Sequence, residues 1–235
     1  MICQTGKDWN IIKEYLKIIS YTALGLVFIV SSFYLVMNYY HYEELKKPLY
    51  ISSGDANYLS YQSKINEINN NLNLFRSKNS TNDNLKTMYN KLLTCQSVLQ
   101  SDGTLATLPV NTYFNSYDIY QLGSKFQTDI LNVCWALHLS YLTEEDVASE
   151  FQDVAPYVIS SINTINNQVN FALAEIQNNS SYFYTTNITS STIRNYLSSD
   201  YTMITNAYNE FADIILNLSE TINQEIEPIS GGNND

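Results

Sequence analysis

The longest uninterrupted apolar run of the chain lies near its N-terminus, from Ile18 to Tyr40. It contains no charged residue, and as one helix it is long enough to cross a hydrocarbon core of about 30 Å. The run is longer than the apolar core of a cleaved signal peptide, and no small-x-small cleavage site follows it. This pattern predicts an uncleaved single-pass transmembrane helix, residues 18–40, that is surrounded by membrane lipid.

The residues that flank this run suggest an orientation. Lys7, Lys13 and Lys17 precede it and Lys46 and Lys47 follow it, and the side richer in Lys and Arg tends to stay in the cytoplasm. We therefore expect a cytoplasmic N-terminus and a large extracytoplasmic C-terminal domain. Aromatic rings favour the headgroup level of a bilayer. The predicted membrane-interface residues are Trp9, Tyr15, Tyr39, Tyr40 and Tyr42.

Residues 1–17 form a short cytoplasmic head ahead of the span. Trp9, Ile12, Tyr15 and Leu16 are three or four positions apart, which is typical of an amphipathic helix. Two interpretations stay open. The head is either an interfacial turn that continues the membrane helix or a docking helix for a cytoplasmic partner.

After a juxtamembrane linker, residues 41–55, apolar residues recur at alternating spacings of three and four in several segments. This period is typical of helices that pack through one apolar seam, as in coiled coils. Each such helix must bury its seam against another, so we predict an all-α fold: an elongated antiparallel bundle of four to five helices over 56–227, followed by a flexible tail, 228–235. The predicted seams are Tyr58, Tyr61, Ile65, Ile68, Leu72 and Phe75; Leu85, Met88, Leu92, Cys95 and Leu99; Ile119, Leu122, Phe126, Ile130, Val133 and Leu137; Val147, Phe151, Val154, Val158, Ile162, Ile165, Val169, Ala172 and Ile176; and Ile193, Leu197, Ile204, Phe211, Ile215, Leu218, Ile222 and Ile226.

Breaks in the period predict the limits of the bundle helices. Residues 104–115 have no helical period and predict a connector or a short extended piece. The third bundle helix is expected over 116–142. Thr143 followed by acidic residues resembles a helix start. Pro156 predicts a kink or a break one turn earlier in the helix that follows.

The charge of the chain is acidic and unevenly distributed. The formal net charge is −11, and from Phe126 to Asp235 the only Lys or Arg is Arg194, against fourteen acidic residues. We therefore expect no nucleic-acid partner. The acidic residues either form a surface that selects a basic partner or solvate the outer faces of the helices.

Candidate chemistry is sparse. Cys134 and His138 could supply two ligands to a metal, but zinc needs three or four and the sequence offers no others nearby. The acidic cluster from Glu144 to Asp153 lacks the spacing of a calcium loop. No phosphate-binding, nucleophile-elbow or metalloprotease motif occurs. We predict no catalytic residue, no cofactor and no metal.

Two cysteines in the body allow two states. Cys95 and Cys134 both lie at or beside apolar seams. An oxidising compartment would allow a disulfide between them, whereas two buried free thiols fit the same positions. The sequence does not decide between these alternatives.

Two aromatic groups lie in segments predicted to connect helices. In a bundle that runs up and down from the membrane, both connections return to the membrane side. We hypothesise that these residues lie near the outer leaflet or contact a membrane-embedded partner; alternatively, they close the end of the bundle. They are Tyr113, Phe114 and Tyr117, and Tyr182, Phe183 and Tyr184.

These features favour a non-catalytic function. We expect a membrane-anchored scaffold or accessory subunit of a multiprotein envelope or membrane complex, whose protein partners bind through helical contacts. The alternative is an extracytoplasmic sensor or ligand-binding bundle. An enzyme is the least favoured class.

Overall fold

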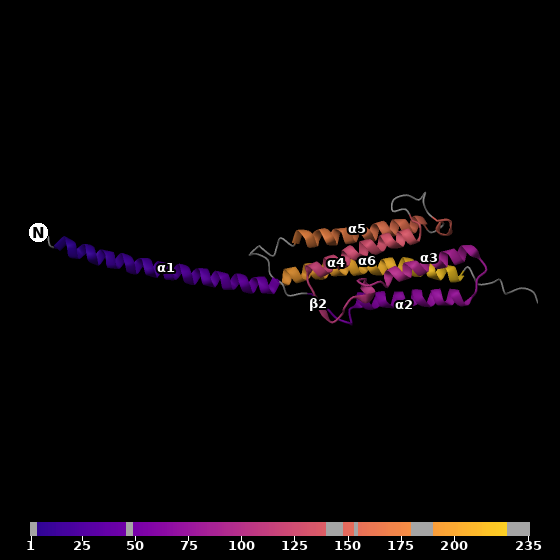
Figure 1. Cartoon of the computed structure of the whole chain (residues 1–235), viewed down its shortest axis with the longest axis horizontal. Helices are drawn as coiled ribbons and strands as arrows, with labels where there is room; N and C mark the ends of the chain where they lie inside the picture. Colours follow the sequence, from indigo (N-terminus) through magenta and orange to yellow (C-terminus); the bar gives the residue numbers. More distant parts are fainter. Residues whose placement is uncertain (1–3, 46–48, 140–147, 153–154, 180–189, 225–235) are drawn as a thin grey trace, which may run out of the picture.

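The chain folds as one long N-terminal helix followed by a helical bundle (Figure 1). The computed structural model describes residues 4–45, 49–139, 148–152, 155–179 and 190–224. Within these residues the fold is all-α, with six α-helices, two short 3-10 turns and one small two-stranded sheet.

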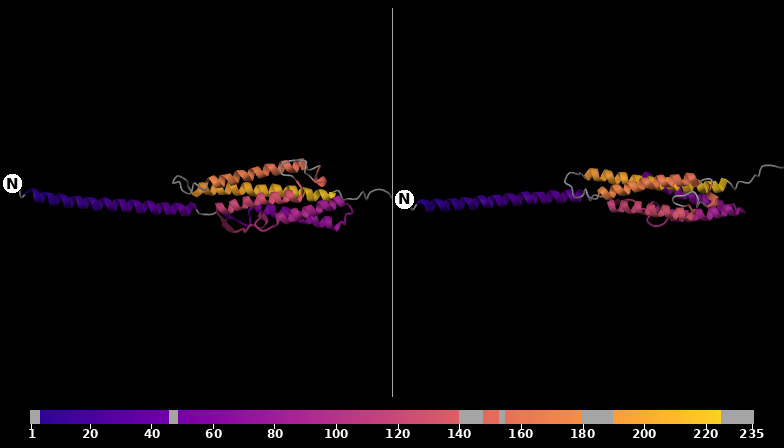
Figure 2. Two further views of the ribbon diagram at one scale, coloured as in Figure 1. Left: turned by 45° about the horizontal axis from the view of Figure 1, so that its top comes forward. Right: turned by 90° about the horizontal axis from the view of Figure 1, so that it is seen from above.

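Helix α1, Gln4–Leu45, is continuous from the predicted head through the predicted span. It projects from one end of the bundle, and both views in Figure 2 show it far from the bundle core. None of its apolar stretch, Ile11–Tyr40, is buried. An exposed N-terminal apolar helix of this kind is found in membrane anchors and in signal sequences.

The bundle contains five helices whose directions alternate along the chain (Figure 1). The central helix α6 packs against each of the other four. A long helix in this position shields one side of every neighbour from water. The bundle helices are α2, Ala56–Ser77; α3, Asp83–Leu99; α4, Ser116–Ala136; α5, Ala155–Asn179; and α6, Ser190–Gln224.

Asx side chains cap the first three bundle helices. Asp55 accepts a hydrogen bond from the Tyr58 backbone N–H at 2.9 Å, and Asn82 caps α3 in the same manner. Asn115 and Asp118 form a reciprocal capping box at the start of α4. Each cap satisfies backbone N–H groups that have no partner in the first helical turn, and so determines where the helix begins.

The predicted apolar seams form the core. Every predicted seam residue whose burial is described is buried, except Tyr58, which is half-buried. Val147, Val154 and Ile226 lie outside the described residues. The periodicity therefore identified which face of each helix points inward.

Helix α4 ends earlier than expected, at Ala136 rather than near residue 142. His138 adopts a left-handed conformation with φ of 53°. Its N–H bonds to the Trp135 carbonyl at 3.1 Å, and the Leu139 N–H bonds to the Cys134 carbonyl at 2.8 Å. This is the Schellman pattern, in which glycine is the usual left-handed residue. The stop was missed because His stands where Gly would have marked it.

Pro156 lies in the first turn of α5, and a separate 3-10 turn, Ser149–Phe151, precedes that helix. Pro is tolerated in a first turn, where backbone N–H groups have no intrahelical partner. The predicted break before Pro156 is therefore present. The expected helix start from Thr143 to Asp146 lies outside the described residues.

Helix α6 is buried on more sides than a single seam would require. Asp200, Thr205 and Ser219 are at most 1% exposed, although polar residues of these types usually lie at the protein surface. The hydrogen-bond partners of polar α6 residues come largely from α2 and its C-cap, at positions seven apart: Asn57, Lys64, Asn71 and Lys78. Their partners rise in number along α6 in the same order, so α2 and α6 run parallel.

A small sheet lies where α1 meets the bundle. Strand β1, Leu49–Ile51, pairs antiparallel with β2, Thr112–Phe114, and Tyr50 stands opposite Tyr113. β1 lies within the predicted linker, and β2 is the extended piece predicted within 104–115. Asn111, with φ of 60°, secures the pairing by donating its N–H to the Ile51 carbonyl at 2.7 Å. Strand β1 is thus joined to β2 and to Asn111 by backbone hydrogen bonds.

Candidate functional site

The end of the bundle that faces α1 carries exposed aromatic rings. The rings of Tyr50 and Tyr113 meet edge to face with centroids 5.0 Å apart, and both are at least half exposed. Tyr117, at the start of α4, is 67% exposed. Phe114 points inward and belongs to the core. We refer to Tyr50, Tyr113 and Tyr117 as the tyrosine collar.

The structure therefore separates the first predicted aromatic group into two exposed tyrosines and one core phenylalanine. It also adds Tyr50, which the sequence pattern did not single out because β1 was expected to be linker. The second predicted group, Tyr182, Phe183 and Tyr184, lies outside the described residues. The helix ends on either side of that segment, the last turn of α5 and the first of α6, lie at the α1 end of the bundle (Figure 1).

The predicted membrane-interface residues lie along α1. The side chains of Trp9, Tyr15, Tyr39 and Tyr40 are each more than half exposed. Tyr42 belongs to the same helix, and its side chain lies outside the described part of the chain. These aromatics stand at both ends of the apolar run, as the sequence indicates.

Cys95 of α3 and Cys134 of α4 are both buried and both free in the structure. Burial raises the pKa of the Cys134 thiol to about 11. The pKa of Cys95 is raised further, first by burial and then by the neighbouring Cys134. Neither group is a thiolate at neutral pH, so the pair has no nucleophilic character in this state.

Two carboxyl groups are buried in the bundle, one on α4 facing α6 and one on α6 itself. Asp129 of α4 is fully buried and bonds to Lys125 and to the hydroxyl of Tyr208. Burial raises the pKa of Asp129, because the bonds from Lys125 and Tyr208 offset only part of the desolvation. Lys125, Asp129 and Tyr208 are hydrogen-bonded in a chain, so this cluster links α4 to α6 inside the bundle.

The second buried carboxyl, Asp200, lies near the α1 end. It is 1% exposed, and its Oδ1 has no hydrogen-bond partner among the residues that the structure describes. Burial, and then the adjacent Glu175 of α5, raise the pKa of Asp200 to about 7. A small cavity of about 20 Å³ adjoins Asp200, and its walls are mainly apolar, with Ile176, Ile193 and Leu197 among them. The arrangement holds a proton near neutral pH but offers few groups that could hold a ligand.

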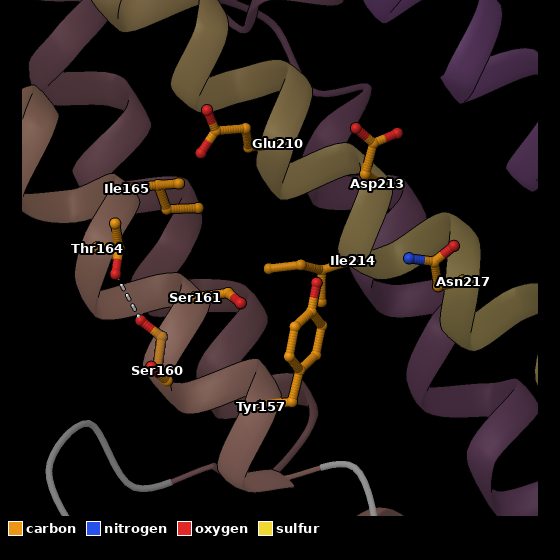
Figure 3. Close-up of a pocket in the computed structure, with 9 residues that line it drawn as sticks. All are labelled: Tyr157, Ser160, Ser161, Thr164, Ile165, Glu210, Asp213, Ile214 and Asn217. Atoms are coloured by element: carbon orange, nitrogen blue, oxygen red, sulfur yellow. Dashed lines mark hydrogen bonds between the residues drawn. The ribbon is translucent and has the colours of Figure 1, made fainter.

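A surface hollow lies between α5 and α6 (Figure 3). We call it the α5–α6 groove; its volume is about 320 Å³. Small hydroxyl side chains of α5 face α6 here and leave the space open. The groove is lined by Tyr157, Ser160, Ser161, Thr164 and Ile165 of α5 and by Glu210, Asp213, Ile214 and Asn217 of α6.

The two walls of the groove differ in chemistry. The α5 wall carries hydroxyl groups and the exposed Tyr157 ring, whereas the α6 wall carries two carboxylates and one amide (Figure 3). Ile165 and Ile214 are buried and form its apolar floor. Asp213 also accepts a hydrogen bond from Lys64 of α2 at 2.6 Å. No sequence pattern indicates this groove, because its residues come from two helices about fifty positions apart.

Among the described residues, no group of three or more His, Cys, Asp or Glu side chains is arranged to hold a metal ion. No family model, curated protein or solved structure matches the chain.

Proposed function

We propose that the protein is a non-catalytic, membrane-anchored scaffold or accessory subunit of a multiprotein membrane complex. The observation that carries the proposal is the contrast between the two parts of the chain. The seams of the bundle are buried within the bundle itself, whereas the apolar stretch of α1, Ile11–Tyr40, is not buried. In water such a helix would be unfavourable, since each exposed leucine- or phenylalanine-sized side chain forgoes about 2 kcal/mol of burial.

In this proposal residues 18–40 span the bilayer, the N-terminus is cytoplasmic, and the acidic bundle is extracytoplasmic. The chain geometry supports a bundle close to the membrane. From Tyr40 to Leu45 α1 rises about 7.5 Å, and the five residues from Leu45 to Tyr50 reach at most about 18 Å. The β1–β2 pairing then holds Tyr113 beside Tyr50. Tyr50 of the tyrosine collar therefore lies within about 25 Å of Tyr40.

We assign the tyrosine collar to contact with the headgroup layer or with a membrane-embedded partner. Tyrosine suits this location because its ring is apolar and its hydroxyl remains hydrated. The acidic charge of the bundle disfavours close contact with anionic lipid, so neutral headgroups or protein are the better match.

Purification of cross-linked native membranes in a mild detergent tests the scaffold function. We expect the full chain to migrate in an assembly larger than its own detergent complex, with defined partners cross-linked to the bundle. As a control, the apolar run of α1 is replaced by an unrelated apolar helix of the same length. If the bundle supplies the contacts, the assembly persists in this control. A chain that migrates alone under all conditions contradicts the proposal.

The second candidate function is an extracytoplasmic ligand-binding bundle, and the α5–α6 groove is the observation that favours it. Its volume of about 320 Å³ lies at the lower end of small-molecule sites. A monomeric chain whose melting temperature rises with a small ligand would support this function over the scaffold. A substitution at Ser161 that fills the groove should then remove the thermal shift.

A further inference from the structure

The α5–α6 groove is rich in hydrogen-bond acceptors. Glu210 and Asp213 carry carboxylates and Asn217 carries an amide oxygen. The Thr164 hydroxyl donates its own proton to the Ser160 carbonyl at 3.0 Å, which leaves its oxygen as an acceptor (Figure 3). A ligand that pairs with these acceptors therefore needs several hydrogen-bond donors.

The negative charge of this groove is only partly compensated within the bundle. Lys64 pairs with Asp213, but Glu210 has no ion pair or hydrogen bond in the described part of the chain. No Lys or Arg of the α5–α6 region other than Arg194 is available to pair with it, and Arg194 lies more than four helical turns away along α6. The groove thus presents one unpaired carboxylate, that of Glu210, with which a cation of another molecule could form an ion pair.

An aromatic ring lies at the other end of the groove. Tyr157 is 68% exposed, and Figure 3 shows its ring standing beside Ile214 with the carboxylates on the opposite helix. A long cationic side chain can pack its apolar stem against such a ring while its charged end donates to the carboxylates. Guanidinium carries five N–H donors in a planar fork and can bond to two carboxylates at once, whereas an ammonium is a compact point charge.

We propose that the α5–α6 groove binds an arginine side chain presented by a helix of a partner protein. In this arrangement the guanidinium donates to Glu210 and to the free lone pairs of Asp213, and the aliphatic part of the side chain extends toward Tyr157. Its aliphatic stem covers Ile165 and Ile214. The groove volume of about 320 Å³ is large enough for one such side chain. The proposal rests on the scaffold function, since it names the chemistry of one partner contact.

A pair of matched peptides tests this assignment on the full chain in a neutral detergent. One is an alanine-rich helical peptide with two arginines one turn apart, and the other carries citrulline, which keeps the shape and removes the charge. We expect the arginine peptide to bind, measured by fluorescence anisotropy, and the citrulline peptide to bind at least about tenfold more weakly. Equal binding of the two peptides, or no binding of either, overturns the proposal.

Two charge-matched variants locate the contact. Glu210→Gln removes the unpaired carboxylate and should weaken arginine-peptide binding about tenfold. Glu67→Gln removes one charge from an exposed position on α2 and should change binding less than about twofold. An equal loss in both variants means attraction by overall charge and overturns the assignment. Circular dichroism melting verifies that both variants fold as the wild type does.

The same measurements separate this inference from the scaffold function. If Glu210→Gln binds the peptide as tightly as the wild type while the native assembly persists, the arginine site is wrong and the scaffold function stands. If the chain never enters an assembly, the scaffold function fails whatever the peptides do.

Discussion

The hydroxyl of Tyr208 donates a hydrogen bond of 3.1 Å to Oδ2 of Asp129, and both residues are fully buried between α4 and α6. Three aromatic rings surround this bond: those of Tyr61 and Phe126 stand edge to face against Tyr208, and Phe211 packs on Phe126. A buried carboxylate without this donor would lose a charge-assisted bond that water cannot replace.

Replacement of Tyr208 by Phe should therefore lower the free energy of unfolding of the bundle by about 1–3 kcal/mol. The matched control is Tyr89→Phe, because the Tyr89 ring stacks on Phe75 and its hydroxyl has no hydrogen bond among the described residues. Denaturant titration followed by circular dichroism measures both changes. A Tyr208→Phe variant as stable as the control would contradict the role given to this bond.

Asp200 predicts a pH dependence of stability. Its pKa is about 7 in the folded bundle and near its ordinary value of 3.8 in the unfolded chain. Between these values the folded state holds a proton that the unfolded state releases. The free energy of unfolding should therefore fall as the pH rises from about 4 to about 7, by about 1.4 kcal/mol for each unit of pKa difference at most.

Asp200→Asn removes this titration. Its stability should exceed that of the wild type above pH 7 and approach it near pH 4, because the neutral amide mimics the protonated carboxyl beside Glu175. Urea titrations at several pH values measure the difference. A constant offset between the two proteins at every pH would show that Asp200 does not titrate in this window.

The two body cysteines predict a pattern of alkylation. If Cys95 and Cys134 are free and buried in the mature protein as they are here, a thiol reagent should leave both unmodified in the folded bundle and label both in denaturant without reductant. Mass spectrometry of the labelled chain measures this. Labelling of neither thiol in denaturant until reductant is added would indicate the disulfide that the sequence also allows.

His138 predicts a stabilising substitution. Its left-handed conformation costs a non-glycine residue about 1 kcal/mol. His138→Gly should raise the stability of the bundle by up to that amount, less the added entropy of the unfolded chain. His138→Ala serves as the comparison and should gain nothing, since alanine keeps its Cβ. A glycine variant less stable than the alanine variant would exclude this explanation of the α4 end.

The tyrosine collar predicts contact with the membrane surface. Tyr113→Trp in a chain whose Trp9 and Trp135 are replaced by Phe places one fluorophore in the collar. In vesicles, lipids brominated close to the headgroup should quench it. The control is Tyr157→Trp, which marks the α5–α6 groove and should be quenched much less. Equal quenching at the two positions would remove the membrane-facing role of the collar.

The sequence predicted the bundle well where burial follows a helical period. Leu85, Met88 and Leu92 recur at that period, and all are buried in α3. The central position of α6 could not be predicted in this way. Asp200, Thr205 and Asn209 look solvent-facing in the sequence, and they are buried because other helices supply their partners, such as Asn57 for the Thr205 hydroxyl.

The candidate sites were less predictable, for a related reason. Tyr113 and Tyr117 stood out as aromatics within one short segment, but their neighbour Tyr50 joins them only through strand pairing. The α5–α6 groove brings Tyr157 and Glu210 to one surface through the antiparallel packing of two helices. Local periodicity carries no information about such long-range pairs, so the groove required the structure.

The anchor and the orientation both require that α1 is held in lipid. Alkaline carbonate extraction of native membranes, with N-terminal sequencing of the chain that remains in the pellet, tests this in one measurement. We predict that the mature chain stays in the pellet and still contains residues 18–40. A chain released into the supernatant, or a mature chain that begins after Tyr40, would contradict the anchor and the orientation derived from it.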